Sequence, residues 1–159
     1  MASNADITER MPKYEIITDG SCLKNPGGPG GWACIIRHRG NEQILHGFEL
    51  ETTNNRMELQ AAIAGLENIK PWCQVVVLTD SEYLRKGISE WVPRWKRRGW
   101  TTGEGKPVKN KDLWLKLDAL CKLNTVEWKW IRGHDGHSDN ERCDKLARRM
   151  AEYAKATSN

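Results

Sequence analysis

Residues 16–31 read Ile-Ile-Thr-Asp-Gly-Ser-Cys-Leu-Lys-Asn-Pro-Gly-Gly-Pro-Gly-Gly and predict a buried strand that ends at an acid. The run from Tyr14 to Ile17 is rich in β-branched and aromatic side chains, and Asp19-Gly20 should stop the strand. In a sheet that carries helices on its faces, ligands bind beyond such strand ends, so Asp19 is a candidate site residue. Taken alone, an Asp before a Gly is more often a turn residue.

The glycine-rich end of this stretch, residues 27–31, has two interpretations. Its glycines could form a loop that binds a phosphate group. The segment lacks, however, the Lys-Ser/Thr pair of a P-loop and the spacing of a dinucleotide-binding loop. We therefore expect a tight entry to a hairpin.

Length and composition fit one globular domain. The chain has 159 residues, of which 38% are hydrophobic, and this is enough for a single core. Residues 1–12 are polar and lack the apolar segment of a signal peptide, so we expect a disordered lead before a domain at 13–159. No apolar run reaches membrane-spanning length. The five cysteines lack metal-binding spacing and indicate reduced thiols in a cytoplasmic protein.

Positive charge is concentrated between Arg85 and Lys111. This segment has nine Lys or Arg against two acids, in a chain whose net charge is +4. Tryptophans at positions 91, 95 and 100 are interleaved with the cations, and such a surface favours salt-sensitive binding to phosphate backbones. The alternative is a solvated amphipathic helix whose tryptophans are partly core.

The next segments predict two more strands and a helix. The strands are expected at Trp32–His38 and Glu42–Glu49, in an antiparallel meander with the first. A helix should run from Asn55 to about Ile69, because Asn55 and Glu58 have the spacing of a capping box and apolar residues repeat at helical intervals. Glu58 shares a helix face with small residues, so it is a cap, a site acid or both.

A later strand ends in the same Thr-Asp pair as the first. Residues 74–80 have the continuous apolar character of a strand buried on both faces, and they end at Asp80 before a short helix. Asp80 alone would be interpreted as an N-cap. Two strands of one sheet that both end in Thr-Asp would, however, bring two like charges together, and this favours a functional role for Asp19 and Asp80.

The last part of the chain predicts a helix, a strand and a helix. They are expected at 110–123, at 125–131 and from Ser138 to about Tyr153, the last with Ser138 and Glu141 as a capping box. The core face of the last helix should hold Cys143, Leu146, Ala147, Met150 and Ala154. Asp144 lies at the margin of that face, and by itself it would be a solvated helix acid.

Four acids can converge at the carboxyl edge of this sheet, namely Asp19, Glu58, Asp80 and Asp144. Four carboxylates in a small volume cannot all stay ionised without cations, and hard oxygen ligands suit Mg²⁺ or Mn²⁺. Two such ions, about 3.5–4 Å apart, can activate water on one side of a phosphorus atom and stabilise the leaving oxygen on the other. With a basic segment nearby, the residues predict a metal-dependent nuclease.

Seven motifs cover nearly everything after Lys13. They are Thr-Asp-Gly-Ser-Cys at 18–22, Thr-Thr-Asn-Asn-Arg-Met-Glu-Leu at 52–59, Thr-Asp-Ser at 79–81, Trp-Lys-Arg-Arg-Gly-Trp at 95–100, Pro-Val-Lys-Asn at 107–110, Gly-His-Asp-Gly-His at 133–137 and Asn-Glu-Arg-Cys-Asp at 140–144. In kind and order they are those of type 1 ribonuclease H of bacteria, and the chain resembles that family.

This resemblance implies both a fold and an activity. The fold is α/β, with a five-stranded mixed sheet of order 3-2-1-4-5 flanked by helices on both faces. The activity is endonucleolytic cleavage of the RNA strand of RNA–DNA hybrids, which leaves 3′-hydroxyl and 5′-phosphate ends. We expect the protein to act as a monomer without a membrane partner.

Carried over residue by residue, the resemblance gives each acid a role. It implies two Mg²⁺ ions per site during catalysis, with Mn²⁺ as a substitute. Asp19 would bridge both ions, Glu58 and Asp80 would hold the ion on the leaving side, and Asp144 would hold the one near the attacking water. His134 would be a mobile auxiliary group.

The resemblance also places residues against the hybrid duplex. A basic handle at about 88–111 would grip the DNA strand, while small polar groups around the metal site would read 2′-hydroxyl groups across the minor groove. The residues expected to bind substrate are Cys22, Asn25, Asn54, Asn55, Ser81, Glu82, Tyr83, Trp91, Trp95, Lys96, Arg97, Arg98 and Trp100.

Two positions depart from the family pattern. Glu82 stands where the family often has glutamine, and a carboxylate accepts hydrogen bonds without donating them. Asp135 adds a negative charge beside His134.

Two rival functions remain. They are a non-catalytic binder of hybrid or double-stranded RNA and a transposase-like or resolvase-like nuclease. The intact set of acids argues against the binder, and the absence of extra DNA-binding domains argues against the recombinase.

Overall fold

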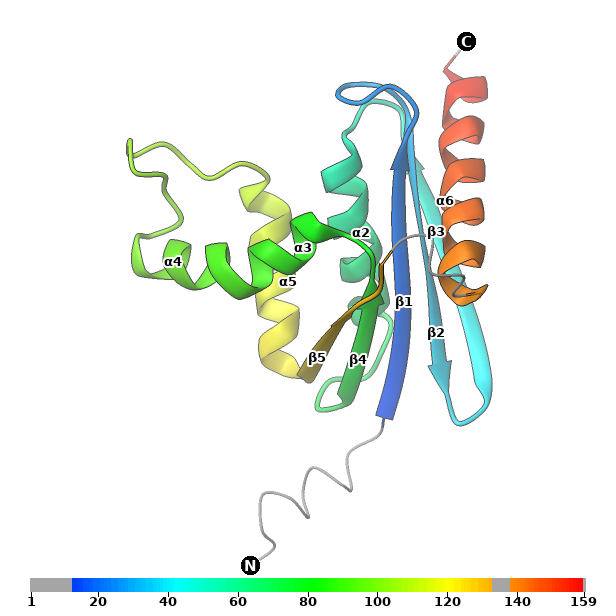
Figure 1. Cartoon of the computed structure of the whole chain (residues 1–159), viewed down its shortest axis with the longest axis horizontal. Coiled ribbons are helices and arrows are strands. Elements are labelled where there is room, and N and C mark those ends of the chain that lie inside the picture. Colours follow the sequence, from blue (N-terminus) through cyan, green and yellow to red (C-terminus); the bar gives the residue numbers. More distant parts are fainter. Residues whose placement is uncertain (1–12, 133–137, 159) are drawn as a thin grey trace, which may run out of the picture.

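The computed structural model of the protein describes residues 13–132 and 138–158, and Figure 1 shows how the elements are arranged. The strands are β1 (Lys13–Cys22), β2 (Gly30–His38), β3 (Asn41–Glu49), β4 (Gln74–Thr79) and β5 (Thr125–Trp130). The helices are α2 (Asn54–Glu67), α3 (Glu82–Lys86), the π-helical turn η1 (Gly87–Trp91), α4 (Val92–Arg97), α5 (Lys111–Leu123) and α6 (Ser138–Thr157). The expected lead at 1–12 and the segment 133–137, with His134 and Asp135, lie outside the described residues.

The strands form one mixed sheet in the order β3-β2-β1-β4-β5, which confirms the predicted topology. The pairs β1–β2 and β2–β3 are antiparallel, whereas β4 is parallel to β1 and β5 is parallel to β4. Parallel neighbours bring their carboxyl ends to the same edge of a sheet. The segments that follow β4 and β5, and the last part of β1, therefore meet at one edge.

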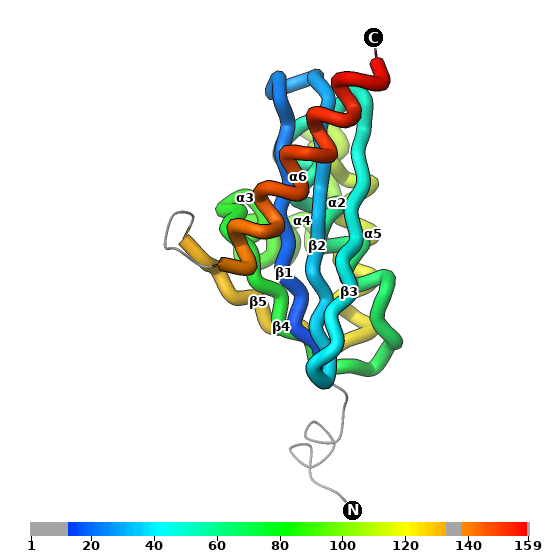
Figure 2. Tube along the Cα trace, turned by 90° about the vertical axis from the view of Figure 1, so that its right-hand side faces the viewer, coloured from blue at the N-terminus to red at the C-terminus, as the bar shows by residue number. Residues whose placement is uncertain are grey.

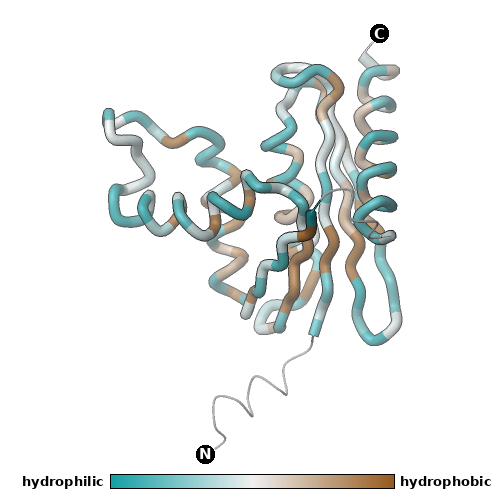
Figure 3. Tube along the Cα trace, viewed as in Figure 1, coloured by the Kyte–Doolittle hydropathy of each residue, from teal (hydrophilic) through white to brown (hydrophobic). Residues whose placement is uncertain are grey.

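Helices cover both faces of the sheet, as Figures 1 and 2 show. The main core lies against α2 and α5 and includes Ile16, Leu59 and Trp114. A smaller cluster lies against α6 and includes Ile17 and Cys143. Because successive side chains of a strand point to opposite faces, β1 contributes to both cores in turn. Figure 3 shows apolar residues along the inner strands and mainly polar residues along α6.

The end of β1 differs from the prediction. The strand continues past Asp19 because its antiparallel ladder with β2 continues, and Cys22 is paired with Gly30. The parallel ladder with β4 ends earlier, where Ile17 is paired with Leu78. Asp19 therefore lies inside a strand, but beyond the last β1–β4 pair.

The prediction that β4 is buried on both faces is also wrong. Its buried residues, Val75, Val77 and Thr79, alternate with half-buried ones. The reason is the position of α6, which packs mainly on β1, β2 and β3. The face of β4 on the side of α6 is therefore only partly covered.

The α6 helix is longer than predicted and buries smaller residues. It continues beyond Tyr153 to Thr157. The residues that it buries are Asn140, Cys143, Ala147, Ala151 and Ala154. The predicted core residues Leu146 and Met150 are only half-buried, because the alanines allow the helix to lie close to the sheet. The residues before Ser138 lie outside the described part of the chain, so its capping box stays a prediction.

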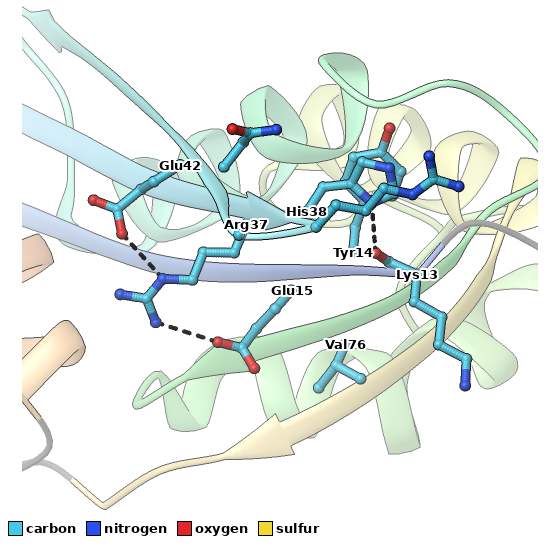
Figure 4. A pocket seen from close by; sticks show the side chains of 10 residues that line it. Lys13, Tyr14, Glu15, Arg37, His38, Glu42 and Val76 are labelled. Atoms are coloured by element: carbon cyan, nitrogen blue, oxygen red, sulfur yellow. Dashed lines mark hydrogen bonds and ion pairs between the residues drawn. The ribbon is translucent and has the colours of Figure 1, made fainter.

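An ion-pair network fastens the first turn of α6 to the sheet. Arg37 of β2 donates to both carboxylate oxygens of Asp139, and its Nε lies 3.0 Å from Glu42 of β3. Arg142 of α6 pairs with Glu42 in turn. Figure 4 shows Arg37 between Glu42 and Glu15 of β1. The network connects β1, β2 and β3 to α6, the helix that carries the predicted site acid Asp144.

Close packing of α6 on β2 requires a glycine at position 31. A Cβ atom on Gly31 would lie 2.4 Å from the carbonyl oxygen of Ala147 and 2.5 Å from Cβ of Met150. Gly31→Ala should therefore displace α6 and lower the free energy of unfolding by about 1–3 kcal/mol, as measured by urea denaturation.

Gly103 provides the matched control for this substitution. A Cβ atom at Gly103 would meet nothing within 4 Å. Gly103→Ala should change the free energy of unfolding by less than about 0.5 kcal/mol. Equal stabilities of the two variants would contradict the tight contact between β2 and α6.

Candidate active site

The four predicted acids surround one open cleft at the edge of the sheet. The cleft has a volume of about 370 Å³ and is lined by Asp19, Gly20, Asn54, Asn55, Glu58, Asp80, Ser81, Glu82, Tyr83 and Asp144. One carboxylate oxygen from each of Asp19, Glu58 and Asp80 lies within 4.8 Å of the other two. Asp144 lines the same cleft from α6, outside this close trio.

Asp19 is held at the base of the cleft by β1. Its side chain is 3% exposed, and its Oδ1 accepts a hydrogen bond of 2.9 Å from the backbone N–H of Gly20. Asp19 is two residues from Ile17 and so shares the face of β1 that α6 covers. This placement brings Asp19 towards Asp144. The side chain of Asp144 also pairs with Arg148 one turn further along α6, at 2.7 Å.

Glu58 reaches the cleft because α2 lies very close to β1. A Cβ atom on Gly20 would lie 2.5 Å from the backbone nitrogen of Glu58, so a residue with a side chain would not fit between them. The predicted capping box of Asn55 and Glu58 is wrong, because α2 starts one residue earlier and Thr53 caps it. The Oγ1 of Thr53 accepts from the backbone N–H of Arg56 at 3.2 Å. Glu58 is therefore a buried acid, 4% exposed, and not a cap.

Asp80 follows β4 and is fixed through its backbone. The interpretation of Asp80 as an N-cap is wrong, because Ser81 caps α3 by accepting from the backbone N–H of Leu84 at 3.2 Å. Trp130, at the end of β5, donates its indole N–H to the carbonyl oxygen of Asp80 at 3.3 Å. The position of Asp80 thus depends on its neighbour in sequence and on the adjacent strand.

Burial and like charge raise the pKa values of two of the acids. Burial is the main cause for Asp19, the charge of Asp80 adds to it, and together they raise the pKa of Asp19 to about 8. Burial, followed by the charge of Asp19, raises the pKa of Glu58 well above its usual range. The Oε2 of Glu58 is buried and has no hydrogen-bond partner among the described residues. Oxygen atoms in this state fit a divalent cation, whose charge would offset both effects.

The residues expected to bind substrate fall into three groups. Those that line the cleft are Asn54, Asn55, Ser81, Glu82 and Tyr83. Cys22 and Asn25 do not line it but hold the connection between β1 and β2 against the start of α2. Asn25 Oδ1 accepts from the backbone N–H of Asn54 at 3.2 Å, and Cys22 Sγ lies 3.6 Å from the carbonyl oxygen of Thr52. This connection is the expected hairpin entry. The third group lies in the basic handle.

The tryptophans of the handle pack against one another and against α5. The ring centroids of Trp91 and Trp95 are 6.0 Å apart, as are those of Trp95 and Trp100. Trp95 also contacts Trp114 of α5, with centroids 5.7 Å apart. All three handle tryptophans are half-buried at the edge of the main core. The alternative interpretation, that these tryptophans are partly core, is thus correct.

The handle cations differ in whether the protein already neutralises them. Lys96 Nζ lies 2.6 Å from Asp118 of α5. Arg97 and Arg98 are exposed, and neither pairs with an acid within the described ranges 13–132 and 138–158. The two arginines are therefore the stronger candidates for phosphate contacts.

Tyr83 connects the cleft to the handle through contacts that the sequence did not predict. Its hydroxyl oxygen accepts from Nδ2 of Asn110 at 2.9 Å and from Nε1 of Trp114 at 3.0 Å. Arg56 donates to Oδ1 of Asn110 and pairs with Asp112 at 2.8 Å. Arg56 and Asn110 both belong to motifs noted in the sequence, but their contact joins segments more than fifty residues apart. Only the folded chain shows it.

Comparison with known proteins gives a consistent family. The RNase H family model matches residues 11–152. The Ribonuclease H of Enterobacter sp. (strain 638) is 57% identical over 140 residues, which is 87% of this chain and 89% of that protein. An Escherichia coli Ribonuclease H is 53% identical over 141 residues, 89% of this chain and 90% of that protein.

A solved structure is similar in fold as well as in sequence. It is that of LC9-RNase H1, described as a type 1 RNase H with the type 2 active-site motif. The TM-score is 0.81 at 32% identity, over 91% of this chain and 74% of that one. The similarity of fold therefore extends over most of this chain.

The raised pKa of Asp19 predicts that its charge destabilises the metal-free protein. The pKa rises from 3.8 to about 8 on folding, so the folded state loses stability as the pH rises through this interval. Asp19→Asn avoids that loss. In EDTA, urea denaturation should show the variant to be close to the parent at about pH 4 and more stable by about 2–5 kcal/mol above about pH 8.

Asp112→Asn is a control of opposite sign. The hydrogen bonds from Arg56 lower the pKa of Asp112, so the Asp112 carboxylate stabilises the folded protein above its usual pKa. Asp112→Asn should lower stability slightly at neutral pH and lose its effect in acid. Parallel pH profiles for the parent and Asp19→Asn would contradict the burial of a charged carboxylate in the cleft.

Proposed function

The chain belongs to the bacterial type 1 branch of the ribonuclease H family of hydrolases, and from this premise we propose that it cuts the RNA strand of RNA–DNA hybrids. One observation carries the proposal: three carboxylate oxygens lie within 4.8 Å of one another in the cleft, from Asp19, Glu58 and Asp80. Buried like charges are costly, and a protein that only bound duplexes would have no need of them. This supports a catalytic function over the rival binder.

Mg²⁺ is the proposed cofactor of this metal-dependent family, with two ions per site during catalysis and Mn²⁺ as a substitute. The residues that would hold the ions are Asp19, Glu58, Asp80 and Asp144. Bound cations lower the pKa of water and offset the negative charge that develops around phosphorus. Asp19 would contact both ions, with Glu58 and Asp80 on the side of the leaving oxygen and Asp144 on the side of the attacking water. Water would form a new bond to phosphorus as the bond from phosphorus to the 3′ oxygen breaks and that oxygen takes up a proton, leaving 3′-hydroxyl and 5′-phosphate ends.

The residues around the acids would select and orient the RNA strand. Asn54 and Asn55 line the cleft and can donate to or accept from 2′-hydroxyl groups, whereas the carboxylate of Glu82 can only accept. Arg97 and Arg98 would bind phosphates of the DNA strand from the handle. His134 is proposed to move a proton or assist product release, since an imidazole changes its charge near neutral pH.

The protein is further proposed to be a monomer in the cytoplasm, and residues 13–159 are proposed to form one domain. All five cysteines have free thiols, which is typical of a reducing compartment. Among the helices of the described residues, none has the length and apolar character needed to cross a bilayer. The hybrid duplex is the proposed partner.

Asp19→Asn and Asp80→Asn test the proposed function directly. Each substitution removes a carboxylate from the close trio, so each should abolish cleavage of a labelled hybrid in Mg²⁺. Binding of the hybrid in Ca²⁺, measured by gel shift, should survive because the handle is intact. Glu152→Gln removes the same charge from the exposed side of α6 and should leave cleavage unchanged. Substantial Mg²⁺-dependent cleavage by Asp19→Asn would refute the assignment.

The handle is tested by the salt dependence of hybrid binding. Arg97→Ala and Arg98→Ala should each reduce the slope of log affinity against log salt by roughly 0.9, the value for one phosphate contact on B-form DNA. Lys96→Ala should change the slope less, because Lys96 already pairs with Asp118. If all three variants keep the parent slope, the handle does not contact the duplex.

A further inference from the structure

We propose that Arg85, Trp130 and Arg132 form a phosphate-binding platform for the strand that is cut, on the β5 side of the acid cleft. The inference rests on the proposed function and adds a substrate contact to it. The platform lies outside the handle, and none of its side chains lines the cleft. It would bind a phosphodiester of the RNA strand near the one that is cleaved.

The platform is attached to the backbone that carries Asp80. The indole N–H of Trp130 donates to the carbonyl oxygen of Asp80 at 3.3 Å. One residue further, the backbone N–H of Ile131 donates to the carbonyl oxygen of Thr79 at 2.8 Å. The end of β5 is thus hydrogen-bonded both to Thr79, the last residue of β4, and to Asp80, the residue after it. A group bound on the indole would keep a fixed position relative to the acids.

Two guanidinium groups gather at this one indole ring. The Cζ of Arg85, from α3, lies 4.8 Å from the ring centroid of Trp130, and the Cζ of Arg132 lies 5.8 Å from it. Both arginines are exposed, and neither forms an ion pair with any residue in the described part of the chain. Stacking on an indole orders a guanidinium and leaves its N–H donors available to a ligand.

Among residues 13–132 and 138–158 no acid pairs with either arginine of the platform, and the polyanionic substrate would supply the negative charge. Two cations at one ring repel each other, and an anion bound between them and the solvent would offset that repulsion. A phosphodiester has two unesterified oxygens that match the donors of a guanidinium. The strand that is cut must pass beside Asp80, which is bonded to the same indole. A phosphate of that strand is therefore the ligand with the required charge and position.

The platform also differs from the handle in what it can do. Arg97 is the last residue of α4 and Arg98 is its C-cap, whereas Arg85 and Arg132 lie at the ring of Trp130, which donates to Asp80. Phosphate contacts position a nucleic acid without reading its sequence. We therefore expect the platform to set the affinity and register of the RNA strand, not its base preference.

Alanine variants of the two arginines test the platform in Mg²⁺-dependent cleavage of a labelled hybrid. Arg85→Ala and Arg132→Ala should each raise KM roughly two- to fivefold, as expected for an exposed ion pair, with kcat nearly unchanged. Each should also lower the salt slope of binding by roughly 1. The control is Lys70→Ala, an exposed cation just before β4, at the opposite end of that strand from Asp80. It should match the parent.

Hybrids with single uncharged methylphosphonate linkages identify the strand. When one particular RNA linkage near the cleavage site is uncharged, the parent should bind the hybrid more weakly than the fully charged hybrid. The Arg85→Ala/Arg132→Ala double variant, which has already lost that contact, should bind both hybrids equally. The assignment would be overturned if the parent and the double variant responded alike to an uncharged linkage at every RNA position, or differed only for linkages in the DNA strand. If the parent cuts hybrids but the arginine variants behave like Lys70→Ala, the platform is wrong and the proposed function stands. If the parent does not cut hybrids at all, the proposed function fails, and the inference fails with it.

Discussion

The burial of the neighbouring carboxyl groups of Asp19 and Glu58 is the constraint on which the site depends. Both side chains are less than 5% exposed, and burial and like charge raise the pKa of each. The fold keeps them together because α2 contacts β1 where Gly20 has no side chain. The stability gained from the two cores holds the acids in a position that they would not adopt alone, and a divalent cation would remove most of the cost.

The surroundings of the acids show how the rest of the molecule fits this constraint. The close trio draws on β1, α2 and the segment after β4, and Asp144 enters from α6 on the other face. The Arg37 network fixes the first turn of α6, and the hydroxyl of Tyr83 links the cleft to the handle. Cations lie around the cleft, on the handle and at Trp130, and not within the acid trio. A polyanion that spans these cations would be drawn across the acids and the metal ions they hold.

Much of this arrangement could be predicted from the sequence. Alternating and apolar runs placed all five strands within about two residues, except for the end of β1. That end depends on pairing with β2, which continues after the β4 ladder has stopped. The motifs named the four acids, and the structure places all of them on one cleft. The sheet order and the role of each acid came from the family resemblance, because spacing alone left a turn residue, an N-cap and a solvated helix acid as alternatives.

The errors came where long-range contacts decide between equivalent local choices. Residues 52–55 offer two threonines and two asparagines as caps, and the close approach at Gly20 selects Thr53. The contact of Trp130 with Asp80 joins residues fifty positions apart, so the alternating pattern of β5 predicted a strand but not this role. The most direct test of the central claim is incubation with labelled RNA–DNA hybrid, RNA duplex and DNA duplex, in Mg²⁺ or in EDTA. The acid cleft predicts Mg²⁺-dependent cleavage of the RNA strand of the hybrid alone, whereas an intact hybrid, or equal cutting of all three duplexes, would contradict it.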